Sequence, residues 1–309
     1  MAARRPDLDR AGLEIIRSAD GATGLAVAPA VGGGIAAYWS DYGSRRIDWL
    51  RPADAAALAK RDPLGLSCFP LLPYSNRIRD GRFTYGGRAV QCARDPVHDP
   101  HAEHGHGWKA VWNVNRRAAD FLSIAYRHQA DDWPFAYSAR QEFRLDGRDL
   151  SVAIALTNEG NAAMPCGIGL HPYFPRTPDC RLAASAPRMW RTDGAALPLE
   201  LIDPPAEARL DRGLAVASVP LDTAYAGWSG TAVIEWPEWR ASLTMRAAGP
   251  LGHLVVYTPP GESYFCAEPV SNCADAFNLA AQGRGDTGLI ELPPGQTVGA
   301  KITLSPTIG

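Results

Sequence analysis

A ten-residue stretch from Cys166 to Pro175, CGIGLHPYFP, holds the first side chain suited to proton transfer. His171 is a titratable imidazole, and the proline after it biases its backbone toward an extended conformation. Tyr173 supplies a flat apolar face beside it. Gly167 and Gly169 lack side chains where a strand normally has bulk, which indicates the close approach of backbone or ligand. His171 is therefore a candidate general acid, and a packed structural histidine is the alternative.

The second candidate is a carboxylate at the end of an apolar, aromatic segment. Glu268 directly follows Tyr264 to Ala267, YFCA. A buried carboxylate without a partner is costly, so this one needs a partner or a chemical role. Glu268 is the most informative acidic residue of the chain.

Polar residues that could hold a hydroxylated ligand lie in two other stretches. Asn76 and Arg77, in PYSNRIRDG, offer amide and guanidinium donors suited to hydroxyl oxygens. Asp222 lies in VPLDTAY and, taken alone, is an ordinary turn residue. A turn asparagine and a surface arginine are equally ordinary alternatives for the first pair.

A run of histidines and acids between residues 98 and 108 could suggest a metal site. His104 and His106 would share a face of a strand, as in cupin-like sites, but glycines interrupt the run and no later ligand has suitable spacing. We therefore expect no metal here, and instead a loop carrying one sugar-binding histidine near Trp108. The run contains His98, Asp99, His101, Glu103, His104 and His106.

The elements that position these residues are predicted to be short strands. Apolar and polar residues alternate from Tyr137 to Leu145 and again from Leu150 to Leu156, and Asp146-Gly147 suits a tight turn between them. Further strands are expected at 24–28, 35–39, 231–236, 241–246, 254–258 and 298–304, and one short helix at 54–61. No long amphipathic helix appears. The pattern predicts an all-β fold, with residues 1–309 forming a single domain of packed antiparallel sheets, a large β-sandwich.

Composition excludes several kinds of partner. Lys plus Arg is 31 and Asp plus Glu is 33, and a net charge of -2 argues against nucleic acid or an anionic membrane as the main partner. No apolar run approaches a membrane span. The first ten residues are basic but lack the apolar core of a signal peptide. The six scattered cysteines are expected to be reduced thiols, and the protein is expected in the cytoplasm.

Five short pieces, in order along the chain, together resemble the aldose 1-epimerase (galactose mutarotase) family over about residues 12–305. A late Leu292-Pro293-Pro294-Gly295 turn fits as well. Each piece is weak alone, but the ordered set is specific. The pieces are Asn76-Arg77-Ile78 with Gly81 and Phe83; His104-Gly105; His171-Pro172-Tyr173-Phe174; Leu221-Asp222; and Glu268-Pro269 followed by Asp275-Ala276-Phe277-Asn278.

The resemblance implies a β-supersandwich fold and interconversion of the α and β anomers of an aldose, without metal or cofactor. By position, Glu268 matches the family's general base and His171 its general acid. The residues that match or adjoin its sugar-contacting positions are Asn76, Arg77, His104 and Asp222. Trp108 or Tyr173 would provide a stacking face.

Hemiacetal opening removes a proton from O1 and adds one to the ring oxygen, so we expect the base and a protonated His171 on opposite sides of the sugar. Leu170 and His106 stand where galactose-type members usually carry Asn and Gly, so the identity of the sugar stays open. The expected partner is a small-molecule sugar, and the protein a monomer or homodimer. Alternatives are a hexose-6-phosphate 1-epimerase using Arg79 and Arg82, a non-catalytic carbohydrate-binding protein, and a metal-dependent cupin-type enzyme.

Overall fold

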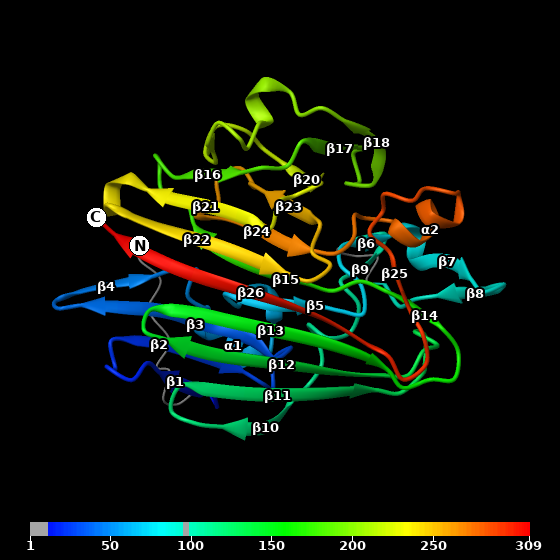
Figure 1. Cartoon of the computed structure of the whole chain (residues 1–309), viewed down its shortest axis with the longest axis horizontal. Coiled ribbons are helices and arrows are strands. Elements are labelled where there is room, and N and C mark those ends of the chain that lie inside the picture. Colours follow the sequence, from blue (N-terminus) through cyan, green and yellow to red (C-terminus); the bar gives the residue numbers. More distant parts are fainter. Residues whose placement is uncertain (1–11, 95–98) are drawn as a thin grey trace.

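The computed structural model describes residues 12–94 and 99–309. The expected absence of a signal peptide and the role of His98 concern residues outside these ranges. Two large antiparallel sheets dominate the described chain (Figure 1). The strands of the first sheet follow in the order β1 (Glu14–Arg17), β2 (Thr23–Ala28), β3 (Gly34–Tyr42), β5 (Cys68–Leu71), β15 (Gly169–Pro175), β24 (Tyr264–Val270), β23 (His253–Tyr257), β20 (Asp222–Ala226), β17 (Arg188–Thr192) and β18 (Pro198–Ile202). Strand β4 (Arg45–Asp48) also belongs to this sheet and pairs with β3.

The second sheet contains the hairpin predicted from residues 137–156. Its strands follow in the order β10 (Asn113–Arg117), β11 (Phe121–His128), β12 (Tyr137–Asp146), β13 (Asp149–Asn158), β26 (Thr297–Ile308), β22 (Ala241–Ala248), β21 (Thr231–Trp236), β16 (Arg181–Ala184) and β19 (Leu214–Ala215). The expectation of large packed antiparallel sheets is confirmed.

The β12–β13 hairpin shows how the sequence produces this architecture. Buried residues alternate with more exposed ones along both strands, so each strand offers one apolar face to the interior. Gly147 takes a φ of 57° in the turn, a conformation that glycine adopts without steric cost. The predicted tight turn is therefore confirmed, but its two central residues are Gly147 and Arg148, because Asp146 is the last residue of β12 and pairs with Asp149.

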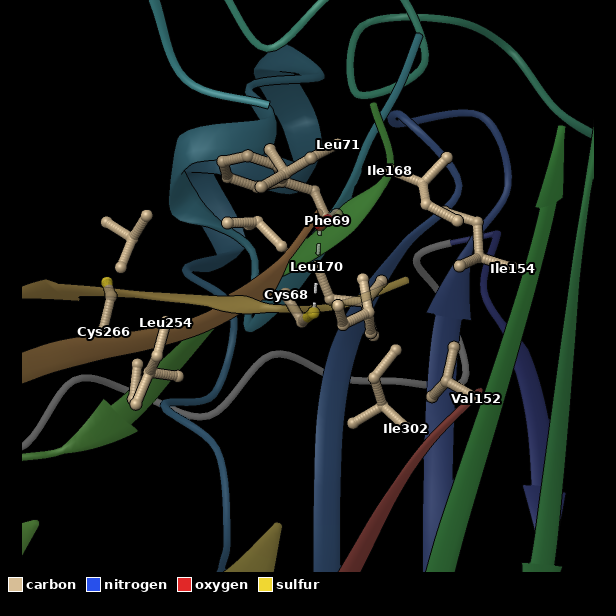
Figure 2. Packing of buried hydrophobic residues seen from close by; sticks show 14 of the residues in the cluster. Cys68, Phe69, Leu71, Val152, Ile154, Ile168, Leu170, Leu254, Cys266 and Ile302 are labelled. Carbon is tan, nitrogen blue, oxygen red and sulfur yellow. Dashed lines mark hydrogen bonds between the residues drawn. The ribbon is translucent and has the colours of Figure 1, made fainter. Parts of the chain in front are cut away.

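The core lies between the two sheets. Leu170 of the first sheet belongs to the same buried cluster as Val152 and Ile302 of the second, and Figure 2 shows these side chains together. All three are at most 4% exposed. Truncating such a leucine to alanine typically costs about 2–5 kcal/mol of stability. The face of β15 that carries Leu170 thus anchors the strand, which leaves the opposite face for chemistry.

Small elements complete the fold. Helix α1 (Ala55–Lys60) agrees with the predicted helix: the Asp54 carboxylate caps its first turn, and Arg61 ends it in the left-handed conformation. Helix α2 (Ala276–Ala281) was not predicted, because six residues are too few to show helical periodicity. Figure 1 shows α2 gathered at one end of the molecule with the pairs β6 (Arg77–Ile78)–β9 (Ala102–Glu103) and β7 (Arg82–Tyr85)–β8 (Arg88–Gln91). The third short pair is β14 (Met164–Cys166)–β25 (Ile290–Leu292). Single 3₁₀ turns lie at Pro63–Gly65, Arg79–Gly81, Ala206–Ala208 and Pro237–Trp239.

No helix among the described residues is both long enough and apolar enough to cross a membrane.

Candidate active site

Two neighbouring strands in the middle of the first sheet carry the predicted acid and base. The antiparallel register of β15 and β24 pairs Tyr173 with Cys266 and so places His171 opposite Glu268. Paired residues of adjacent strands point to the same face. The Nε2 atom of His171 lies 3.3 Å from Oε1 of Glu268, and the two residues are only 8% and 3% exposed. The sequence-predicted acid and base therefore form one buried pair.

Two aromatic rings pack against the imidazole of His171. Phe69 of β5 stacks on it with ring centroids 4.5 Å apart, and Tyr173 stacks at 4.7 Å. The guanidinium of Arg51 lies 3.9 Å from the centre of the Tyr173 ring. Tyr173 is 4% exposed and packs on the His171 imidazole, and its role as a sugar-stacking face stays a prediction. Phe69 and Arg51 were not identified from the sequence.

Burial sets the proton balance of the pair. It lowers the pKa of His171 to about 3, and the charges of Arg51 and Arg77 act in the same direction. Burial raises the pKa of Glu268 well above its ordinary value, and the neighbouring Asp222 carboxylate adds to this. The neutral form is therefore favoured, with a carboxylic acid facing an uncharged imidazole. The expectation of a protonated His171 is wrong for this resting state, because a dry site penalises the imidazolium ion.

The relative placement of the pair also differs from expectation. The acid and the base were expected on opposite sides of a sugar. This is wrong for the observed geometry, because no sugar ring fits between His171 and Glu268 atoms that lie 3.3 Å apart. The pair instead presents two adjacent polar atoms along one edge. That edge suits O1 and the ring oxygen of a hemiacetal, which are bonded to the same carbon.

Arg77 connects this pair to a group of carboxylates. Its guanidinium lies 2.8 Å from Asp99, 3.1 Å from Glu103 and 3.7 Å from Asp222. Burial raises the pKa values of both Glu103 and Asp222, an effect that Arg77 opposes. The structure thus joins the predicted Arg77 and Asp222. The role of Asp99 and Glu103 as partners of Arg77 was missed, because the sequence offered them only as possible metal ligands.

His104 lies beside His171, with ring centroids 5.4 Å apart. The backbone N–H of Asn76 donates to Nδ1 of His104 over 3.1 Å, so the proton of the neutral ring is on Nε2. Burial lowers the pKa of His104 well below its ordinary value and keeps the ring neutral. His104 can therefore donate one hydrogen bond from Nε2. Asn76 acts here through its backbone, and its side-chain oxygen accepts a hydrogen bond from the Arg77 N–H at 2.9 Å.

Steric contacts explain why a glycine follows His104. His104 and Gly105 take φ values of 60° and 68°, and a Cβ at residue 105 would collide with the carbonyl oxygen of Leu72. Only glycine fits this close approach without movement of the backbone. The His-Gly dipeptide therefore fixes the backbone turn that orients the His104 side chain.

The other described histidines of the run make separate contacts. His101 accepts a hydrogen bond at Nδ1 from the Asp80 N–H over 3.1 Å. His106 lies 3.3 Å from Asp132 and stacks on His128 with ring centroids 4.6 Å apart. These two histidines have other partners, whereas His104 adjoins the buried pair.

A cleft of about 870 Å³ lies next to these residues. Glu103 and Trp108 line it. The Trp108 ring also stacks on Phe69 at 5.1 Å and meets His104 edge-on. Trp108 therefore joins the cleft to the rings around His171, although His171 and Glu268 are not among the residues that line the cleft. Among the described lining residues three are basic and four acidic, namely Arg61, Arg94 and Lys109 against Asp62, Asp99, Glu103 and Asp132.

The two arginines considered for a phosphate group are engaged elsewhere. Arg79 lies 3.4 Å from the Asp275 carboxylate, and Arg82 donates to the Gln91 side chain over 2.6 Å. Arg79 therefore links its 3₁₀ turn to the start of α2, and Arg82 links β7 to β8.

The fold and these buried polar groups define a galactose mutarotase-like β-sandwich whose site lies on the face of a large sheet. The chain belongs to the aldose 1-epimerase family, whose model matches residues 14–305. A relative in Escherichia coli K12, the uncharacterized protein YphB, is 30% identical over 281 residues, which cover 88% of this chain and 92% of that protein.

Solved structures agree with the family assignment. A crystal structure from Escherichia coli K12, of a candidate aldose 1-epimerase, has a TM-score of 0.85 and 28% identity and covers 96% of this chain and 100% of the other. A galactose mutarotase-like protein from Clostridium acetobutylicum has a TM-score of 0.83 at 20% identity, with 94% of each chain covered. The second likeness concerns the fold alone.

Proposed function

We propose that the protein is an aldose 1-epimerase that interconverts the α and β anomers of a free, unphosphorylated aldose. The observation that carries this proposal is the buried contact of 3.3 Å between His171 and Glu268. A protein that only binds sugars has no need of an acid–base pair, and a buried carboxyl group facing an imidazole is costly to maintain. Family membership supports the same reaction class.

The neutral pair holds one transferable proton and one vacant base, which is what hemiacetal opening requires. Transfer of the proton from Glu268 to His171 gives a carboxylate and an imidazolium ion. The carboxylate then takes the O1 proton while the imidazolium ion donates to the ring oxygen. The bond from C1 to the ring oxygen breaks, C1 and O1 form a carbonyl group, and the pair returns to its neutral form.

Rotation about the C1–C2 bond then exposes the other face of the carbonyl group. On closure Glu268 returns a proton to O1 while His171 removes one from the former ring oxygen. Each proton transfer of this kind typically contributes ~10²–10⁴-fold to the rate. Arg77, Asp222 and Nε2 of His104 would hold the sugar hydroxyls, and Trp108 would provide the apolar wall.

The charge of the cleft supports a free sugar over a hexose 6-phosphate. Its described lining carries one more acid than base, and Arg77 is already surrounded by three carboxylates. A dianionic phosphate group would meet no surplus of positive charge there.

The test is the conversion of pure α-glucose, α-galactose and glucose 6-phosphate, followed by polarimetry and proton NMR above the spontaneous rate. We expect acceleration with at least one free sugar, a smaller effect with the phosphate, and the full rate after exhaustive dialysis against EDTA. Binding of sugar without acceleration would favour a non-catalytic carbohydrate-binding protein. A rate lost to EDTA and restored by zinc or manganese would contradict the metal-free mechanism.

A further inference from the structure

A third chemically active side chain lies beside the acid–base pair, and the proposed mechanism does not use it. Cys266 is two residues before Glu268 on β24, so both side chains point to the same face of the sheet. The sulfur of Cys266, a ring nitrogen of His171 and a carboxylate oxygen of Glu268 all lie within 4.8 Å of one another. All three residues are buried, and Cys266 is a free thiol.

These three atoms match the donors that zinc prefers in proteins. Imidazole nitrogen, thiolate sulfur and carboxylate oxygen are its usual ligands, and many sites combine three protein ligands with one exchangeable position. With zinc bonds of about 2.0–2.1 Å to nitrogen and oxygen, the N–O edge of a tetrahedron is about 3.3 Å. The observed separation between His171 Nε2 and Glu268 Oε1 is 3.3 Å. With a zinc–sulfur bond of about 2.3 Å the edges from sulfur to nitrogen and oxygen are about 3.5 Å, so the sulfur would have to move inward by up to ~1.3 Å to complete the site.

Charge balance also favours a divalent ion. A thiolate and a carboxylate together neutralise one Zn²⁺, and a buried site accepts such a neutral set more readily than a bare charge. Cys266 and Glu268 would each release one proton to solvent on binding. His171 would stay neutral and donate its Nε2 lone pair.

We propose that His171, Cys266 and Glu268 form a binding site for zinc or a divalent ion of similar ligand preference, and that the bound ion reversibly blocks the acid–base pair. The inhibitory part rests on the proposed epimerase function, while the binding part does not. With both members of the pair coordinated, neither can accept or donate the sugar protons.

A second group of possible ligands, His106, His128 and Asp131, serves as the comparison. The rings of His106 and His128 are stacked with only 20° between their planes, so their lone pairs lie in two nearly parallel, separate planes and do not converge on one ion. His128 Nε2 is also within 3.1 Å of the Trp133 carbonyl oxygen. This second group has no thiol and a different geometry, so His106→Gln is a control for cobalt binding away from Cys266.

The test uses the full-length, metal-free protein with Co²⁺ as the spectroscopic probe. We expect one equivalent of Co²⁺ to produce thiolate-to-cobalt charge-transfer absorption, and excess Zn²⁺ to remove it. Cys266→Ser and Cys266→Ala should abolish this absorption, while His106→Gln should keep it. The other five cysteines remain in both Cys266 variants, so the lost signal reports this thiol. Circular dichroism checks that each variant is folded.

The second measurement is inhibition of mutarotation by Zn²⁺, expressed relative to each variant's own uninhibited rate. We expect reversal by EDTA, and at least a tenfold higher half-inhibitory zinc concentration for a Cys266 variant than for wild type. Absence of the cobalt–thiolate absorption, or its persistence in both Cys266 variants, would overturn the site. Cobalt binding without inhibition of an active enzyme would overturn the inhibitory role. Cobalt binding through Cys266 in a protein without mutarotase activity would support the site while refuting the proposed function.

Discussion

Replacing Glu268 by glutamine tests the acid–base pair most directly. Glutamine keeps the size of the side chain, and its amide can take the place of the carboxyl group that lies 3.3 Å from Nε2 of His171. Because burial keeps Glu268 neutral in the folded protein, the change exchanges one neutral group for another. The unfolded chain ionises Glu268 at neutral pH and glutamine removes the cost of protonating it on folding, so the free energy of unfolding should stay the same or rise. An effect on catalysis is therefore separable from an effect on stability.

The catalytic cost follows from the lost proton acceptor. Glutamine cannot take the O1 proton, so the catalysed mutarotation rate should fall by ~10²-fold or more, which is at least about 2.7 kcal/mol of barrier. His171→Asn should cause a similar loss. The double variant should lose less than the product of the two single losses, because the contact of 3.3 Å makes the two groups one unit.

The assay is the rate of α-to-β conversion above the spontaneous background, with sugar binding measured by calorimetry. Glu103→Gln is the matched control, since it neutralises another carboxylate of the site, one that contacts Arg77 and not His171. We expect it to raise KM more than it lowers kcat. If Glu268→Gln keeps more than about a third of the wild-type rate, the assignment of the base is refuted. Asp222 would then be the next carboxylate to examine.

Three other predictions follow from the described contacts. Burial lowers the folded-state pKa of His104, so the contribution of this residue to stability is complete above pH ~6.5 and is lost as the pH falls toward the folded-state pKa. The wild type should therefore lose unfolding free energy between pH 7.5 and pH 5.5, and His104→Asn should make that loss smaller by about 1.4 kcal/mol. A loss that is unchanged in denaturant titrations of the variant would contradict this prediction. His106→Ala should lower the mutarotation rate by less than roughly tenfold and His104→Ala by more, and the reverse order would show that the wrong histidine was assigned to the sugar. Gly167→Ala should cost about 1–3 kcal/mol in thermal unfolding, because its Cβ would collide with the Asn272 side chain, whereas Gly194→Ala, where a Cβ meets nothing within 4 Å, should change stability by less than about 0.5 kcal/mol.

Local patterns explain which parts of the fold could be predicted. The hairpin from Tyr137 to Asn158 was predictable because alternation and a turn dipeptide are written in consecutive residues. His171 and Glu268 were predictable because each interrupts an apolar strand with a group that is costly to bury. Helix α2 was missed because its six residues are too short for a periodic signal.

The rest of the site depends on strand register. Phe69 stacks on His171 because β5 pairs with β15, two strands about a hundred residues apart in the chain. The spacing of two residues between Cys266 and Glu268 could have indicated that they share a face of a strand, but the approach of Cys266 to His171 depends on the pairing of β24 with β15. No consecutive stretch of sequence contains the two relations to His171, so local reasoning could identify the chemical groups but not all of their neighbours.

Some residues of the candidate site lie on central strands of a large sheet, and others lie on or beside very short strands. His171 and Glu268 lie on β15 and β24, in the interior of the larger sheet, where opening a strand would require disruption of pairings on both sides. Arg77 lies on the two-residue strand β6, and His104 directly follows the equally short β9. Connecting segments outside the large sheets tolerate sequence change better than a central strand does. For the proposed epimerase, evolution could therefore change which sugar is held while leaving the proton-transfer chemistry untouched.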